Sequence, residues 1–286
     1  MLQRPGSGTQ LRTCTFGCVP VRDDFDTRAR LNDLAEAISR ALGIPVRPHR
    51  APSPAALAHA YRAGRVQLAW VSPVLAATDE AFADATPLVR SVRQGVSRYH
   101  GVLFAARDGR VRRLDDLDGA VAAWVTESSA AGYVFPRAAL ARRGFEPRST
   151  FGAERLCGSH GEVVRAVEAG QADVGATFAV YREGDPAREL VRAGFSEDGT
   201  RLDRFRVLLT TDPIPADVVV AAPSALVTAR GDVRGALERL HEDPVALNAL
   251  SHVLGAERFA RAEPGELRSL RAQLGASIEL GGAAAG

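Results

Sequence analysis

AVAAWVTESSAAGY, residues 120–133, runs from an apolar segment into a serine-rich loop and on to a glycine. Its first six residues form a short apolar run of the kind that lies buried in a parallel sheet. The loop that follows, 126–132, opens a segment over 132–143 whose pattern predicts a helix. A buried strand followed by a loop and a helix is the repeating unit of α/β proteins, so this stretch predicts an α/β fold.

The same alternation extends in both directions along the chain. The sequence has 286 residues, 46% of them apolar, which is enough for two modest cores. Leu31, Leu34, Ile38 and Leu42 share one helical face, and Gly43 stands where helices commonly end in a left-handed turn. Strands are expected at 12–19, 44–49, 66–71, 99–106, 120–125, 172–178, 206–211 and 217–222, and helices at 31–42, 55–63, 132–143, 159–169, near 185–193 and over most of 224–274.

Composition excludes several kinds of chemistry. All 36 basic residues are arginine, so no Schiff base, pyridoxal phosphate anchor or phosphate-loop lysine is available. The net charge is +2 and the arginines are spread along the chain, which argues against a nucleic-acid partner. Cys14, Cys18 and Cys157 fit neither a redox motif nor a zinc site, and no catalytic motif is present. We therefore expect no cofactor, no metal and no enzymatic activity.

Membrane and export signals are not visible. No segment approaches the roughly 20 apolar residues of a membrane span, and residues 1–13 contain no apolar stretch typical of an export signal. The sequence as written thus predicts a cytoplasmic protein without a membrane span, and a periplasmic one if the N-terminus is truncated.

Four loops are candidates for ligand binding. In open α/β sheets, ligands lie beyond the carboxyl ends of strands, where helix N-termini offer N–H groups to anions. That rule selects residues 19–24, 72–73, 126–132 and 158–161.

Two of these loops carry candidate ligand-binding side chains. The hydroxyls of Ser128 and Ser129 can point toward a bound oxyanion, although the same serines could simply cap the helix. In the loop GSHGE, Ser159 and Glu162 form a capping-box pattern. His160 is not part of that pattern, and its ring can donate to a ligand oxygen, although lone histidines are more often structural.

Two tyrosines could add phenol donors. Tyr99 begins the strand expected at 99–106, and Tyr181 follows the strand at 172–178. Ordinary aromatic packing is the alternative for both.

Five stretches, in this order, resemble the phosphate, phosphite and phosphonate substrate-binding proteins of ABC transporters. They are FGCVP at 16–20, VQLAWVSP at 66–73, SRYHGVLFAARDG at 97–109, the run from Leu114 to Leu140, and GSHGEVVRAVEAGQADVGAT at 158–177. The resemblance covers roughly residues 11 to 275.

This resemblance implies a two-lobed type II periplasmic-binding fold with a ligand cleft at the hinge. Lobe one would be 11–104 plus 213–275 and lobe two 105–212, with flexible tails at 1–10 and 276–286. The site would comprise Ser72, Tyr99, Ser129 with Ser128 beside it, and the pair Ser159 and His160. The implied partners are a small anion and an ABC permease, and we expect a monomer.

One departure from the family pattern concerns the serine loop. Such loops usually read S-T-S-G-Y, whereas this chain has Ala130 and Ala131 before Gly132 and so lacks two hydroxyls. A hydrogen bond to a charged partner contributes about 1.5 to 3 kcal/mol, so the loss bears on ligand affinity.

Two alternatives to a binding protein remain open. One is a cytoplasmic enzyme on the same fold, such as a lyase of menaquinone biosynthesis or a pyrimidine-forming relative of the thiamine pathway, for which Glu127 and His160 would be the acid and base. The other is a module that acts only through protein contacts.

Overall fold

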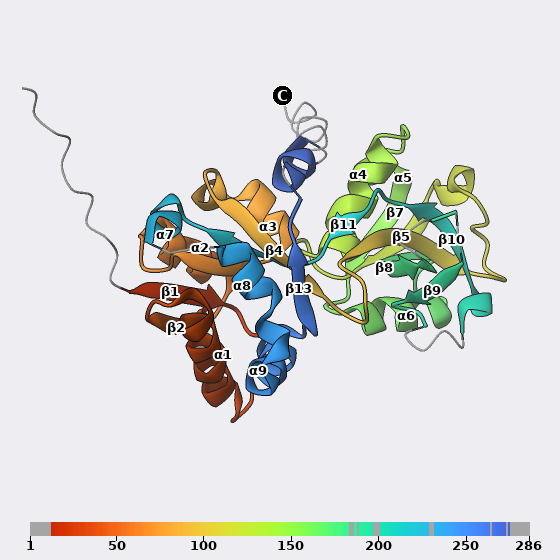
Figure 1. Cartoon of the computed structure of the whole chain (residues 1–286). Helices are drawn as coiled ribbons and strands as arrows, with labels where there is room; N and C mark the ends of the chain where they lie inside the picture. The colour runs from red at the N-terminus through yellow and green to blue at the C-terminus, as the bar shows by residue number, and fades with distance from the viewer. Residues whose placement is uncertain are drawn as a thin grey trace, which may run out of the picture. The chain divides into compact units, whose positions relative to one another are not determined.

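The computed structural model of the chain describes residues 13–274, apart from 183–185, 188, 197–200, 229–231, 264 and 273 (Figure 1). The chain forms two compact units. The first holds the chain up to Ser97 together with Ala216–Leu267, and the second holds Arg98–Pro215 together with the chain from Arg268. The chain therefore passes from one unit to the other between Ser97 and Arg98 and returns after Pro215. The tails expected at 1–10 and 276–286 lie outside the described residues.

The first unit is built on a mixed sheet. Its strands lie in the order β13 (Arg258–Arg261), β4 (Thr86–Val92), β12 (Val218–Ala221), β3 (Leu68–Val71), β1 (Cys14–Cys18) and β2 (Val46–Arg50). β1 pairs in parallel with β2 and β3, whereas β12 is antiparallel to β3 and β4.

Alternation along β1 decides what packs on each face of this sheet. Phe16 and Cys18 are fully buried in a core shared with α1 (Thr27–Leu42) and α9 (Pro244–Leu254), which lie side by side. Gly17 points to the other face, where a Cβ would lie 2.8 Å from Cδ1 of Leu57 in α2 (Pro54–Arg62). The glycine thus allows α2 to pack closely against the strand.

α1 confirms the helix predicted from the spacing of its leucines. Leu31, Leu34, Ile38 and Leu42 are buried. Gly43 ends the helix at φ 65°, in the left-handed region that favours glycine.

The second unit has a sheet covered on both faces. Its main strands lie in the order β10 (Phe205–Thr210), β5 (Arg98–Ala106), β8 (Val174–Tyr181), β6 (Ala120–Trp124) and β7 (Phe151–Leu156). β6 is parallel to β7 and β8, and β5 is antiparallel to β8 and β10. One face packs on α4 (Phe135–Ala141) and the other on α6 (His160–Glu168).

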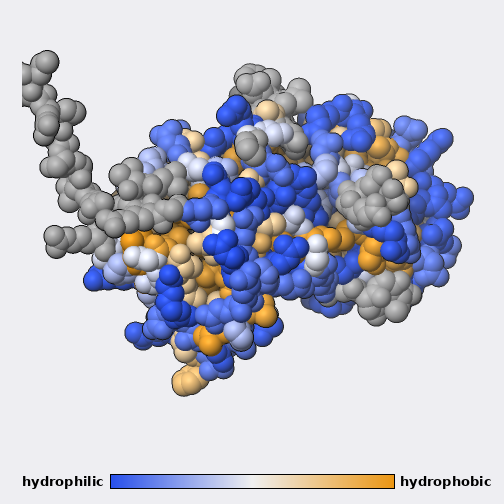
Figure 2. All heavy atoms as spheres, viewed as in Figure 1, coloured by the Kyte–Doolittle hydropathy of each residue, from blue (hydrophilic) through white to orange (hydrophobic). Residues whose placement is uncertain are grey.

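Shorter elements complete the two units. In the first they are α3 (Pro73–Thr78), η1 (Glu80–Phe82), α7 (Pro223–Thr228), α8 (Val233–Glu238) and η6 (Leu240–Glu242). In the second they are η2 (Leu114–Leu117), η3 (Ala130–Val134), α5 (Pro147–Thr150), β9 (Leu190–Ala193), η5 (Leu202–Arg204) and β11 (Ile214–Pro215). Hydrophilic residues cover most of the visible surface of both units (Figure 2). Among the described residues, no helix combines the length and the apolar character needed to cross a bilayer.

One secondary-structure prediction was wrong. The helix expected near 185–193 is replaced, in its described part, by β9, which pairs antiparallel with the end of β8, beyond the part of β8 that pairs with β6. Tertiary pairing of this kind overrides a local helical pattern. Over 224–274 helices dominate the described residues, as predicted, and β13 is a short strand among them that extends the first sheet beside β4.

Candidate functional site

The predicted loops after β6 and β7 start side by side in the second unit. The backbone N–H of Cys157 donates to the carbonyl of Trp124 at 2.8 Å, and that of Gly158 donates to the carbonyl of Val125 at 2.8 Å. These bonds continue the parallel pairing just past the ends of the strands. Residues 126–129 and 157–159 therefore leave the same edge of the sheet, each leading into a helix.

Ser129 caps the helical turn that follows β6. Its Oγ accepts a hydrogen bond from the N–H of Gly132 at 3.1 Å, at the start of η3, which continues into α4. The capping role weighed from the sequence is thus present. Because a hydroxyl accepts and donates at once, the cap leaves the Ser129 O–H as a donor.

Gly132 keeps this turn tight. A Cβ on Gly132 would lie 2.3 Å from Cγ2 of Val125 and 2.8 Å from Oγ of Ser129. Any side chain there would displace the capped serine, which explains the glycine in the loop.

The rest of the serine loop faces solvent to different degrees. Ser128 is exposed, and its Oγ lies 3.4 Å from Oγ1 of Thr126. Glu127 is also exposed. Ala130 is half-buried and Ala131 is buried at 3% exposure, so the two positions without hydroxyls differ in their surroundings.

Ser159 caps α6, as the sequence predicts, but the reciprocal half of the capping box is absent. Ser159 Oγ accepts from the N–H of Glu162 at 3.2 Å. The Glu162 carboxylate pairs with Arg165 one turn on, an ion pair that lowers the pKa of Glu162. The two long side chains meet along the exposed helix face, so Glu162 does not return to the backbone.

His160, the first residue of α6, is half-buried and contacts two residues of β8. Its Nδ1 lies 2.9 Å from Oγ1 of Thr177 in β8, and its ring packs edge-on against Phe178 at a centroid distance of 5.3 Å. Burial lowers the pKa of His160, because the charged form loses water on entering this environment. The imidazole is therefore neutral at neutral pH and carries one N–H.

Thr177 was not predicted as a site residue. It is fully buried, and its hydroxyl meets His160 because α6 packs against β8. Gly194 makes room for that hydroxyl, since a Cβ on Gly194 would lie 1.9 Å from Thr177 Oγ1. The sequence gives no direct signal for this contact, because the register of β8 depends on pairing across the sheet.

The two tyrosines lie in neighbouring strands at the same end of the sheet. Tyr181 ends β8 and is 6% exposed, and its hydroxyl lies 2.9 Å from Oγ1 of Thr210. Burial raises the pKa of Tyr181, and its ring packs edge-on against His100. Tyr99 is half-buried near the start of β5, opposite Ile214. Packing thus accounts for Tyr181.

Ser72 belongs to the first unit, whereas the other six predicted residues belong to the second. It follows β3 and is half-buried, and its Oγ accepts from the N–H of Leu75 at the start of α3.

In the first predicted loop, residues 19–24, Asp24 binds Thr27 and His252, and these contacts lower the pKa of Asp24.

Within the part of the chain that the structure describes, no group of three or more histidine, cysteine or acidic side chains is placed to hold a metal ion.

Comparison with protein families places these loops in context. The model of the periplasmic substrate-binding proteins of phosphonate ABC transporters matches residues 16–267. The chain belongs to this family. The family match includes both loops of the candidate site. It confirms the resemblance to substrate-binding proteins that the sequence indicates. No curated protein sequence matches the chain.

Solved structures show the same fold. XAC2383 from Xanthomonas citri, bound to ATP, has a TM-score of 0.70 at 22% identity over 94% of this chain and 98% of its own. A binding protein component of a phosphonate ABC transporter from Pseudomonas aeruginosa has a TM-score of 0.58 at 19% identity, over 91% of this chain and 85% of its own. PhnD1 from Prochlorococcus marinus, in complex with methylphosphonate, has a TM-score of 0.62 at 17% identity, over 94% of this chain and 98% of its own.

These similarities confirm the predicted fold class, a two-lobed α/β protein of the type II periplasmic-binding kind. The family is a substrate-binding component of transporters and not a family of enzymes. The alternative of a menaquinone or thiamine pathway enzyme has no support from these findings.

Proposed function

We propose that this substrate-binding protein binds a small ligand of the phosphate, phosphite or phosphonate class, with donors from the loops after β6 and β7. The observation that carries the proposal is the shared origin of those loops, joined by the bond from Gly158 N–H to Val125 C=O. Two helical segments then start at one edge of the sheet, and their free N–H groups and dipoles attract an anion.

His160 and Thr177 supply a directed donor in this proposal. A neutral imidazole that accepts at Nδ1 carries its proton on Nε2. We assign the Thr177 hydroxyl as donor to Nδ1, which leaves the Nε2–H of His160 for a ligand oxygen. A neutral donor suits this role, because it binds an oxyanion without requiring a second buried charge.

The serine loop supplies a smaller set of hydroxyls than is usual in the family. Ser129 and Ser128 keep theirs, whereas Ala130 and Ala131 contribute only backbone N–H groups at the start of η3, which a helix leaves without internal acceptors. Tyr99 completes the proposed set within the second unit, with Ser159 as the cap that holds α6 and His160 in place. Ser72, in the first unit, stays a prediction. Tyr181 holds the end of β8 through Thr210.

The two units are proposed to act as the lobes of a receptor. In this proposal the two units move as two bodies, closure on the ligand is the output, and an ABC permease reads the closed form. Membership of a periplasmic family supports action in the periplasm. We further propose that the protein acts as a monomer. Light scattering of the purified chain and fractionation of cells that express the native gene test these two points.

Calorimetry tests the ligand class directly. The full chain is titrated with methylphosphonate, phosphite, phosphate and acetate, and thermal unfolding is measured with each. Saturable binding of at least one phosphorus oxyanion is expected, weakened about tenfold or more in Ser129→Ala and in His160→Gln, as loss of one charge-assisted hydrogen bond predicts. Ser251→Ala, an exposed serine of α9, is the matched control and should bind as the wild type does. Absence of heat and of any melting shift with all three phosphorus ligands would overturn the proposal.

A further inference from the structure

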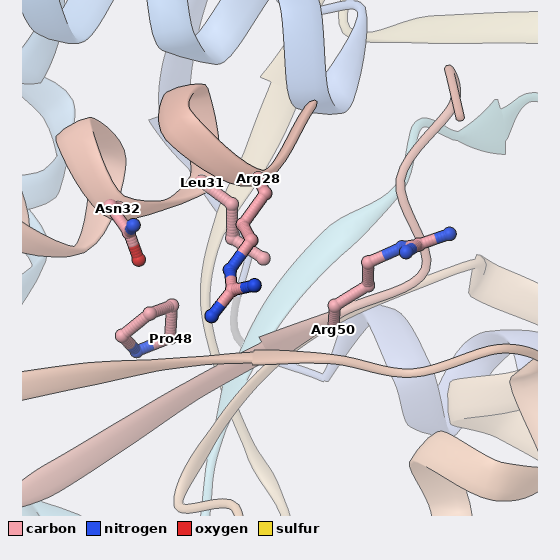
Figure 3. A pocket seen from close by; sticks show the side chains of 5 residues that line it. All are labelled: Arg28, Leu31, Asn32, Pro48 and Arg50. Carbon is pink, nitrogen blue, oxygen red and sulfur yellow. The ribbon is translucent and has the colours of Figure 1, made fainter. Parts of the chain in front are cut away.

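The first unit contains a pocket that none of the seven predicted site residues lines. It has a volume of about 410 Å³ and lies between α1 and the edge strand β2 (Figure 3). Pockets of roughly 300 to 1,000 Å³ are the size that takes small molecules. Its lining residues are Arg28, Leu31, Asn32, Pro48 and Arg50.

Helix and strand periodicity bring these five residues together. Arg28, Leu31 and Asn32 are three and four residues apart, so they share one face of α1. On β2, Pro48 and Arg50 lie on the same side as Val46, which is buried in the core under α1. The exposed Arg47 lies on the opposite side, because successive side chains of a strand alternate. Figure 3 shows Arg28 and Asn32 directed from the helix toward the strand, with Pro48 opposite them.

The pocket combines cationic, amide and apolar groups. The side chains of Arg28 and Asn32 are exposed and have no hydrogen-bond or ion-pair partner among the residues that the structure describes. Arg50 pairs with Asp23, so one of the two guanidinium groups is balanced and the other is not. Leu31 is buried at 3% exposure and, with the ring of Pro48, gives the pocket an apolar wall.

Another β-strand is a poor occupant for this edge. β2 is the last strand of the sheet in the described residues, and Pro48 at its centre has no N–H to offer to an added strand. A discrete molecule with an anionic head and a compact apolar part matches the lining better than a polypeptide backbone does.

We infer that this pocket binds small organic acids, separately from the oxyanion site of the second unit. The carboxylate or other anionic head lies against the Arg28 guanidinium, which presents its donors in a planar fork, and accepts from the Asn32 amide. The apolar part lies against Leu31 and Pro48. Arg50, which pairs with Asp23, also lines the pocket.

The test uses the full chain and benzoate, with benzamide as the neutral probe of equal shape. Nuclear magnetic resonance follows the side-chain Nε–H signals of arginine and the amide signals of asparagine during each titration. Saturable shifts of Arg28 and Asn32 are expected with benzoate but not with benzamide. Arg28→Gln should weaken benzoate binding about tenfold or more, as loss of a charge-assisted hydrogen bond predicts. Arg47→Gln, the adjacent exposed arginine on the opposite face of β2, should leave it unchanged.

Three results would overturn the inference. They are unsaturable benzoate shifts, equal shifts with benzamide, and equal loss in Arg28→Gln and Arg47→Gln. Repeating the titration in Ser129→Ala separates the two sites, because benzoate binding should survive in this variant whatever happens to the phosphorus ligands. Thermal unfolding of each variant in the absence of ligand verifies that the chain is folded.

Discussion

Thr177 Oγ1 lies 2.9 Å from Nδ1 of His160, and this contact joins the middle of a buried strand to the first residue of a helix. The threonine is fully buried and the imidazole is kept neutral by its surroundings. A hydrogen bond at one ring nitrogen decides which nitrogen carries the proton, so a residue of the core sets what His160 offers to a ligand.

Replacing Thr177 with valine removes this hydroxyl and keeps the branched shape. Valine has no donor for Nδ1, so we expect the Nε2–H tautomer of His160 to lose population and methylphosphonate binding to weaken roughly tenfold. The free energy of unfolding should fall by about 1 kcal/mol. Nitrogen-15 chemical shifts of the His160 ring report the tautomer. Thr78→Val, at an exposed site in α3, is the control, and unchanged ring shifts in Thr177→Val would refute the assignment.

Gly194 should tolerate no side chain, although its backbone has no left-handed strain that would require glycine. In Gly194→Ala the new Cβ would lie 1.9 Å from Thr177 Oγ1 and must displace it. We expect a loss of about 1 to 3 kcal/mol in the free energy of unfolding, typical of overpacking, together with weaker ligand binding. Urea denaturation measures the first effect. Thr177→Ala should rescue part of the stability in a double-mutant cycle, and strict additivity of the two substitutions would contradict the proposed clash.

The lowered pKa of His160 predicts how stability depends on pH. The folded chain binds a proton at His160 less readily than the unfolded chain, whose histidine has the ordinary value of 6.5. The contribution of neutral His160 is therefore fully present above pH 6.5 and is lost as the pH falls through the folded pKa. Urea denaturation between about pH 8 and pH 5 should show a steeper decline for wild type than for His160→Asn.

The comparison within this pair isolates His160 from other groups. Burial and Arg65 also lower the pKa of His49, which is present in both proteins and contributes equally to both curves. Parallel curves for wild type and His160→Asn would show that His160 titrates alike in the folded and unfolded chains.

The sequence predicts the parts of this molecule that local patterns determine. The leucine spacing of α1 and Gly43 at its end, the apolar run of β6, and the serine caps at 129 and 159 each follow from residues close together in the chain. What it missed depends on pairing between distant segments. β9 and β13 form at strand edges, and the contact of Thr177 with His160 depends on the register of β8.

The rule for ligand loops in α/β sheets selected both loops, but their adjacency depends on β7, a strand that was not expected from the sequence. Glu162 shows the limit of such motifs. Its backbone N–H donates to Ser159 as the capping-box pattern predicts, but its carboxylate binds Arg165, three residues on, and not the backbone. A motif thus predicts which backbone groups need partners more reliably than which side chain supplies them.

Restoring a hydroxyl at position 130 tests whether the alanines of the serine loop limit affinity. Ala130 is half-buried at the start of η3, next to the Ser129 cap, so a serine there adds a donor without filling a closed core. We expect Ala130→Ser to tighten methylphosphonate binding, by about tenfold if the new O–H reaches a charged oxygen. Ala130→Val adds bulk without a donor and should not tighten methylphosphonate binding.

Ala131→Ser should behave differently, because Ala131 is 3% exposed. A hydroxyl at this position loses water on folding and costs about 1 to 3 kcal/mol of stability unless it finds a hydrogen-bond partner. Calorimetry on the three variants decides the matter: equal affinity for Ala130→Ser and Ala130→Val would mean that the loop does not contact the ligand through this position, and the proposed set of donors would have to move to the start of α6.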